Sequence, residues 1–168
     1  MSVSIYDFSL PIFKLNLNNL AAILEKAASH ADAKKVDPKV LPQLRLIADM
    51  LPLSAQVQIA CDGAKGAAAR LAGIQPPKFE DTEATLPELQ ARVAKTLEFI
   101  SSIKPEQLQG AETREIVLTF PQNTLKFTGL NYLTNFVLPN FFFHLTIAYA
   151  LLRKNGVDIG KRDFLGSI

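Results

Sequence analysis

The feature that most constrains this chain is a run of 26 residues, 127–152, without a single Asp, Glu, Lys or Arg. A segment of that length can cross a bilayer, or it can form the innermost helix of a helical bundle. The run carries polar groups that would need partners within lipid, namely Asn131, Asn135, Asn140 and His144. We therefore expect a helix enclosed by other helices, with no membrane as a partner.

Two further helices are expected in the first half of the chain. Apolar residues recur at intervals of three and four from residue 2 to about residue 31, which predicts an amphipathic helix. Asp37 and Pro38 are typical of a helix start and Gly73 of a helix end, so a second helix is predicted over residues 38–72. Pro52 would bend this helix, because proline removes a backbone hydrogen bond.

The second half is predicted to hold a third helix, a hairpin and the charge-free helix. Residues 74–84 have little periodicity and predict a crossing loop. Thr85 and Glu88 have the spacing of a capping box, and the helix that they begin should end before Lys104. The β-branched and aromatic runs 115–120 and 124–128 predict a hairpin. The fourth helix follows over residues 129–155, and the tail, residues 160–166, is expected to dock.

Length and composition limit the classes of protein to consider. The chain has 168 residues, 48% of them hydrophobic, which favours a single helical-bundle domain over residues 1–168. A net charge of +2 provides no basic surface for nucleic acid. Cys61 is the only cysteine, so no intrachain disulfide can form. With no secretory signal visible at the N-terminus, we expect a cytoplasmic setting.

Chemistry-bearing residues are sparse. No glycine-rich phosphate loop, dinucleotide motif or nucleophile elbow occurs. Of the two histidines, His30 lies near the end of the first predicted helix, where a solvated side chain is expected. His144 lies four residues after Asn140 in the fourth predicted helix, so these two side chains share its inward face.

A polar pocket could form where the second and fourth helices meet. Asp49 and Gln56 are seven residues apart and share a face of the predicted second helix. With Asn140 and His144, they would line an interior pocket if the two helices are neighbours. Three interpretations remain open: a buried hydrogen-bond network with a neutral His144, a bound metal, or use of His144 as an acid, a base or a ligand-binding group.

An aromatic cluster also lies in the charge-free run. Phe141, Phe142 and Phe143 cover nearly one helical turn, and Phe136 precedes them. Such a cluster is typical of a core that extends into a contact patch. We expect a homodimer formed through this patch.

Several motifs resemble those of a protein family. The first group follows residue 44: Arg45-Leu46-Ile47-Ala48-Asp49-Met50-Leu51-Pro52, Gln56-Val57-Gln58, Asp62, Ala64-Lys65 and Arg70-Leu71-Ala72-Gly73. The second follows residue 141: Phe142-Phe143-His144, Thr146, Ala148-Tyr149, Leu152-Arg153-Lys154-Asn155-Gly156-Val157, Gly160-Lys161 and Asp163-Phe164-Leu165-Gly166. Over nearly its whole length the chain resembles the family labelled domain of unknown function nineteen-ninety-three, in the DinB-like superfamily.

The resemblance implies an all-α, four-helix bundle and a metal site. Members of the superfamily are metal-dependent bundles with three histidines, and some are thiol-dependent transferases or isomerases. Their site has one histidine on the second helix and two, spaced by four, on the last. Asn140 and His144 match the pair on the last helix, while Asp49 is nearest to the remaining position. The resemblance thus implies His144 and Asp49 as ligands of a divalent metal such as zinc, nickel or manganese.

Three functions are therefore expected as alternatives. The first is a bundle that binds a small molecule in an interior pocket with a degenerate metal site. The second is a DinB-like metal-dependent enzyme that uses Asp49 and His144. The third is a non-enzymatic structural or interaction protein that acts as a dimer.

Overall fold

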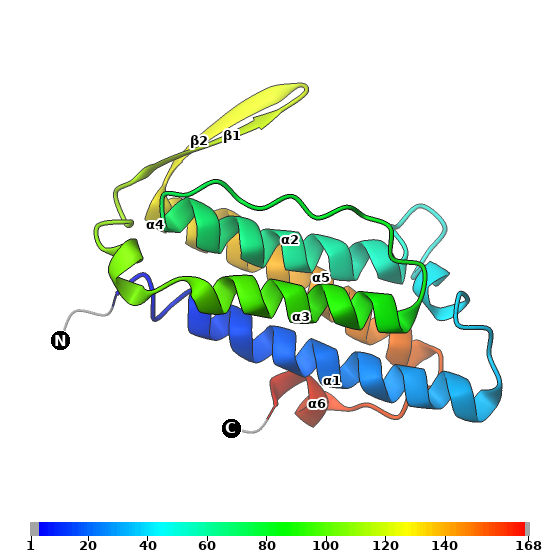
Figure 1. Cartoon of the computed structure of the whole chain (residues 1–168). Coiled ribbons are helices and arrows are strands. Elements are labelled where there is room, and N and C mark those ends of the chain that lie inside the picture. Colours follow the sequence, from blue (N-terminus) through cyan, green and yellow to red (C-terminus); the bar gives the residue numbers. More distant parts are fainter. Residues whose placement is uncertain (1–3, 167–168) are drawn as a thin grey trace.

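The long helices lie side by side in this computed structural model, which describes residues 4–166 (Figure 1). They are α1 (Leu10–Lys34), α2 (Leu53–Leu71), α3 (Leu86–Ser102) and α5 (Leu138–Lys154). Helix α1 packs against α3, α3 against α2, and α2 against α5. Helices α1 and α5 run in one direction and α2 and α3 in the other (Figure 1). The expected helical class is confirmed, and the second and fourth predicted helices are neighbours.

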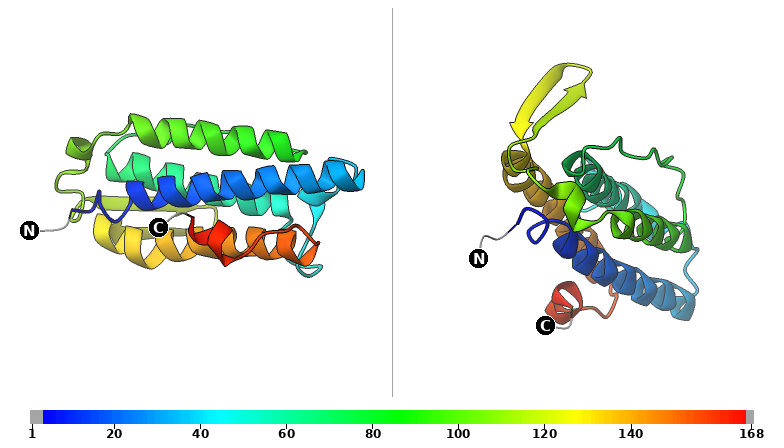
Figure 2. Two further views of the ribbon diagram at one scale, coloured as in Figure 1. Left: turned by 90° about the horizontal axis from the view of Figure 1, so that it is seen from below. Right: turned by 60° about the vertical axis from the view of Figure 1, so that its left-hand side comes forward.

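Shorter elements connect and flank the long helices. They are the 3-10 helices η1 (Leu41–Gln43) and η2 (Pro105–Leu108), strands β1 (Glu115–Phe120) and β2 (Asn123–Thr128), helix α4 (Gly129–Asn131), the π-helix η3 (Tyr132–Val137) and helix α6 (Lys161–Leu165). The predicted hairpin is confirmed, because β1 and β2 pair antiparallel from Glu115 opposite Thr128 to Phe120 opposite Asn123. It extends away from the long helices, beside α4 (Figures 1 and 2).

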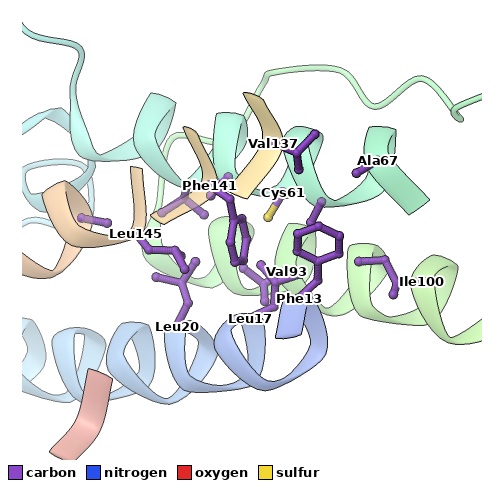
Figure 3. Close-up of a cluster of buried hydrophobic side chains, with 14 of the residues drawn as sticks. Phe13, Leu17, Leu20, Cys61, Ala67, Val93, Ile100, Val137, Phe141 and Leu145 are labelled. Atoms are coloured by element: carbon purple, nitrogen blue, oxygen red, sulfur yellow. The ribbon is translucent and has the colours of Figure 1, made fainter. Parts of the chain in front are cut away.

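The core is built from the apolar stripes of the four long helices. Phe13 of α1 meets Phe141 of α5 edge to face, with ring centroids 5.2 Å apart. Leu17 of α1 and Val93 of α3 lie beside this aromatic pair (Figure 3). An edge-to-face pair adds about 0.5–1.5 kcal/mol to the stabilisation from burial alone. Phe141 is therefore a core residue. The sequence had grouped it with a contact patch, and it cannot belong to one.

From Gly129 onward the charge-free run forms one continuous helical segment, α4, η3 and α5, while its first two residues end β2. By length and composition, Gly129–Lys154 could cross a membrane, and 39% of its most apolar window is buried. Its packing against α2 accounts for its apolar inward face. The segment thus packs against α2 on one side, but it is not enclosed by other helices as the sequence had predicted, because most of this window is not buried.

The second helix begins later than predicted. Residues 38–52 form turns and the short helix η1, and α2 starts only at Leu53. Pro52 is the residue before the helix and has an extended conformation, with φ −70° and ψ 167°. Proline is accommodated there because a residue before the helix does not have to donate a helical hydrogen bond from its nitrogen. The predicted bend at Pro52 is wrong, since the helix starts after the proline.

The first helix also begins later than predicted. The structure places its start at Leu10, after turns that include Ser9, and its end at Lys34. Residues 2 and 3 of the predicted helix lie outside the described residues. Pro11 in the first turn explains the start, because the first helical N–H groups have no intrahelical partner that proline would remove.

The third helix and the tail follow the predictions. Glu88 accepts hydrogen bonds from the backbone N–H of Thr85 at 2.9 Å, and Thr85 Oγ1 caps the Glu88 N–H at 3.5 Å. Helix α6 docks on α1, where Lys26 Nζ lies 2.6 Å from Asp163 Oδ1. The capping box and the docked tail are both confirmed.

Candidate functional site

His144 and Gln56 form a buried pair between α5 and α2. His144 Nδ1 lies 2.7 Å from Gln56 Oε1, and Gln56 Nε2 donates to the Leu51 carbonyl at 3.0 Å. Because the amide oxygen only accepts, His144 must carry its proton on Nδ1. Burial lowers the pKa of His144 below its ordinary value. Of the three interpretations that the sequence left open, the pair therefore favours a buried hydrogen-bond network with a neutral His144.

Asp49 does not join this pair. It lies in an exposed turn before α2, so it does not share a helical face with Gln56. The predicted common face depended on a helix that included residues 38–52. Because Pro52 precedes the helix, that face does not exist.

Asn140 lies apart from the His144–Gln56 pair, at a cavity of about 240 Å³ between α2, β1 and the π-helix. The residues that line this cavity are Asp62, Gly63, Arg70, Val117, Leu118, Thr119, Phe120, Tyr132, Phe136, Val137 and Asn140. A second cavity, of about 450 Å³, shares Arg70, Val117 and Thr119 with it. We refer to the smaller one as the hairpin cavity. Neither is lined by His144 or Gln56.

The π-helix forms one wall of the hairpin cavity. Pro139 follows it closely and cannot donate a hydrogen bond to the carbonyl four residues earlier. Widening to the π register accommodates this loss, and such turns are frequent at functional sites. The wider turn carries Tyr132, Phe136 and Val137, all of which line the cavity.

Arg70 is the cationic residue of the hairpin cavity. Its Nη1 donates to the Tyr132 hydroxyl at 3.1 Å. A Cβ atom at Gly66, one turn earlier on α2, would overlap Arg70 Nη1. Glycine at this position thus leaves the room in which the guanidinium lies. Burial raises the pKa of Tyr132 although Arg70 opposes the shift, so its hydroxyl stays protonated at neutral pH.

Asp62, which also lines the cavity from α2, belongs to a network of charges. Its Oδ1 lies 2.7 Å from Lys65 Nζ and 3.0 Å from Arg92 Nη2. Arg92 is almost completely buried and also meets Asp81 at 2.8 Å and Glu83 at 3.0 Å. These two acids belong to the crossing loop, residues 72–85, which this network holds against α2 and α3.

Cys61 is a core residue. It is fully buried, and burial raises the pKa of its thiol to about 12 despite a hydrogen bond with Thr96. A thiol with such a pKa has almost no thiolate at neutral pH and is a poor nucleophile.

The described residues do not fit the metal site that the resemblance implied. Within residues 4–166, no group of three or more His, Cys, Asp or Glu side chains could hold a metal ion. His144 is paired with Gln56, while Asp49 is exposed in a different part of the chain. A structural metal usually has four protein ligands and a catalytic one three.

The sequence had pointed to Asn140 but not to Arg70 or Tyr132. A signal for both existed. Gly66 and Arg70 are one helical turn apart, and Tyr132 lies one turn before Phe136 in the segment before Pro139. The contact between Arg70 and Tyr132, which are 62 residues apart, required the tertiary structure.

Comparisons with known proteins agree on one family. The model of the family described as Domain of unknown function (DUF1993) matches residues 5–165. A crystal structure of a DinB family member protein from Shewanella denitrificans is similar, with 42% identity and a TM-score of 0.89. The similarity covers 98% of this chain and 93% of that one. No curated protein matches. The chain therefore belongs to the DUF1993 family, and its fold is that of a DinB-like protein.

Proposed function

We propose that this protein binds a small molecule in the hairpin cavity. The observation that carries the proposal is the composition of the cavity wall. Asp62, Arg70 and Asn140 offer polar groups on α2 and α5, and apolar side chains cover the side formed by η3 and β1. Ligand sites are typically apolar cavities with a few polar groups that fix the orientation of the ligand.

The site proposed here keeps only Asn140 of the four residues expected to line the pocket. Gln56 and His144 do not line it and instead form a pair that joins α2 to α5. The alternative of a metal-dependent enzyme that uses Asp49 and His144 has no support from the positions of these two side chains.

A thermal-shift screen of small metabolites and divalent metals tests the proposal. A ligand that binds only the folded state raises the melting temperature. At a concentration of 100 Kd it adds about 2.7 kcal/mol to the free energy of unfolding. We expect at least one organic compound to raise it, and Gly63→Leu to abolish that effect. A Cβ at Gly63 has only Asn140 Nδ2 nearby, at 3.9 Å, so a leucine there would extend into the cavity.

The control is Ala94→Leu, which adds the same side chain on an exposed position of α3. It should leave the ligand effect unchanged. The proposal is wrong if no organic compound shifts the melting temperature, or if Gly63→Leu retains the full shift.

A further inference from the structure

Arg70 lies where the two cavities meet and lines both of them. Its only side-chain hydrogen bond within residues 4–166 is the one to the Tyr132 hydroxyl, at 3.1 Å. A guanidinium group has five N–H donors, so most of its donors remain available to a ligand. The hydrogen bond to the Tyr132 hydroxyl orients the guanidinium, and the missing side chain at Gly66 leaves room for it.

Within residues 4–166, no acidic side chain forms an ion pair with Arg70. The ion pairs of the described chain involve other cations and do not include it. Asp62 is the only acid among the residues that line the hairpin cavity, and its Oδ1 already meets both Lys65 and Arg92. A half-buried positive charge without a matching negative charge favours an anionic ligand.

The aromatic and apolar residues of the hairpin cavity indicate which kind of group the ligand carries beside its negative charge. Phe136 stacks with Tyr132, with ring centroids 6.1 Å apart and an interplanar angle of 18°. Phe120 and Val137 add apolar surface to the same cavity. A flat apolar body packs well on such a surface. One unpaired cation in the cavity matches one negative charge on the ligand.

We propose that the hairpin cavity binds a small aromatic carboxylate, with Arg70 forming a two-point contact to the carboxylate and the π-helix aromatics packing on the ring. This proposal rests on the proposed function and names the ligand class of that site. A planar guanidinium matches a carboxylate through two parallel N–H···O bonds, which makes this residue selective for the group.

Isothermal titration with benzoate and benzamide tests the ligand class. The two probes have the same shape and differ in charge. We expect benzoate to bind the wild-type protein at least tenfold more tightly than benzamide, since a hydrogen bond between two charged groups is about twice as strong as one between neutral groups. Arg70→Met should weaken benzoate binding at least tenfold and leave benzamide binding unchanged.

Two variants control for charge and for position. Arg153→Met removes an exposed cation near the far end of α5 and should leave benzoate affinity unchanged. Gly66→Ala keeps the charge of Arg70 but displaces its guanidinium, so it should weaken benzoate binding without a change in net charge. Circular dichroism of each variant verifies that the helical fold is retained. If Arg70→Met does not fold, Gly66→Ala decides the test.

The outcomes separate this inference from the proposed function. If benzamide binds as tightly as benzoate, or if Arg70→Met and Gly66→Ala bind benzoate like the wild type, the anionic class is wrong. The proposed function then still stands, provided that Gly63→Leu abolishes the binding of the compounds found in the screen. If benzoate binds equally well to Gly63→Leu, its site is elsewhere and the inference is overturned.

Discussion

His144 shows how burial sets the behaviour of a single titratable residue. It is 8% exposed, and burial lowers the pKa of the imidazole and so favours its neutral form, in which Nδ1–H donates to Gln56. Protonation would place a charge at a site that has lost most of its water. In the described part of the chain, no acid forms an ion pair with it to compensate.

Stability should therefore depend on pH through His144. Because burial lowers its pKa in the folded state, the unfolded chain binds more protons below the unfolded pKa of about 6.5. The free energy of unfolding should then decrease as pH falls from 7.5 through that value to 5.5. Urea denaturation at several pH values measures the effect, and His144→Gln should reduce the decrease.

The matched control is His30→Gln, which keeps the buried histidine and should leave the pH dependence as it is in the wild type. An equal pH dependence in the wild type and in His144→Gln would show that this prediction is wrong.

At the scale of elements, the crossing loop depends on one buried cation. Arg92 lies under the loop and meets Asp81 and Glu83, while Lys65 Nζ lies 4.0 Å from the centre of the Phe79 ring. Burial alone would raise the pKa of Glu83, but hydrogen bonds from Gln58 and Arg92 bring it below its ordinary value. These contacts explain why a loop with little periodicity follows a defined path along α2 (Figure 1).

Arg92→Met should release this loop. It leaves three carboxylates without their shared partner, and we expect a loss of about 1–3 kcal/mol in the free energy of unfolding, because these acids are partly exposed. Lys78 is exposed in the loop, so trypsin should cleave after it faster in the variant. Lys161→Met, at an exposed position of α6, should have little effect. Equal cleavage rates in Arg92→Met and the wild type would contradict the prediction.

The junction between the hairpin and the charge-free helix depends on one glycine. A Cβ at Gly129 would overlap the carbonyl oxygen of Ala111. Gly129→Ala should therefore lower the free energy of unfolding by about 1–3 kcal/mol, as overpacked positions do. Thermal and urea denaturation measure it. Gly160→Ala is the control, because a Cβ there meets no atom within 4 Å. A Gly129→Ala variant as stable as the wild type would refute this view of the junction.

At the scale of the whole molecule, the homodimer remains a prediction. The structure narrows the expected patch, because Phe141 is buried while Phe143 is 52% exposed. If the dimer forms through this face of α5, Phe143→Glu should yield a monomer. Light scattering coupled to size-exclusion chromatography measures the mass, with Phe8→Glu as a control on another exposed phenylalanine. A wild-type mass of one chain would refute the dimer.

The sequence predicted those elements whose residues are close together along the chain. The capping box of Thr85 and Glu88, the hairpin and the apolar stripe of α3 all depend on spacings of a few residues. The start of α2 was misplaced because the signals at Asp37 and at Pro52 both fit a helix start, and only packing distinguishes them. Turns at residues 37–40 were formed instead, with Lys39 N–H bound to Asp37.

By itself, the sequence determined that most of the charge-free run is helical and that His144 and Asn140 lie on that helix. Only the tertiary structure decided that His144 pairs with Gln56, that Asn140 lines a cavity and that Asp49 takes no part. The physical reason is the range of the interactions. Helix periodicity and capping act within a few residues, whereas the contact between Arg70 and Tyr132 and the ion pairs of Arg92 join segments that meet only after the helices have packed.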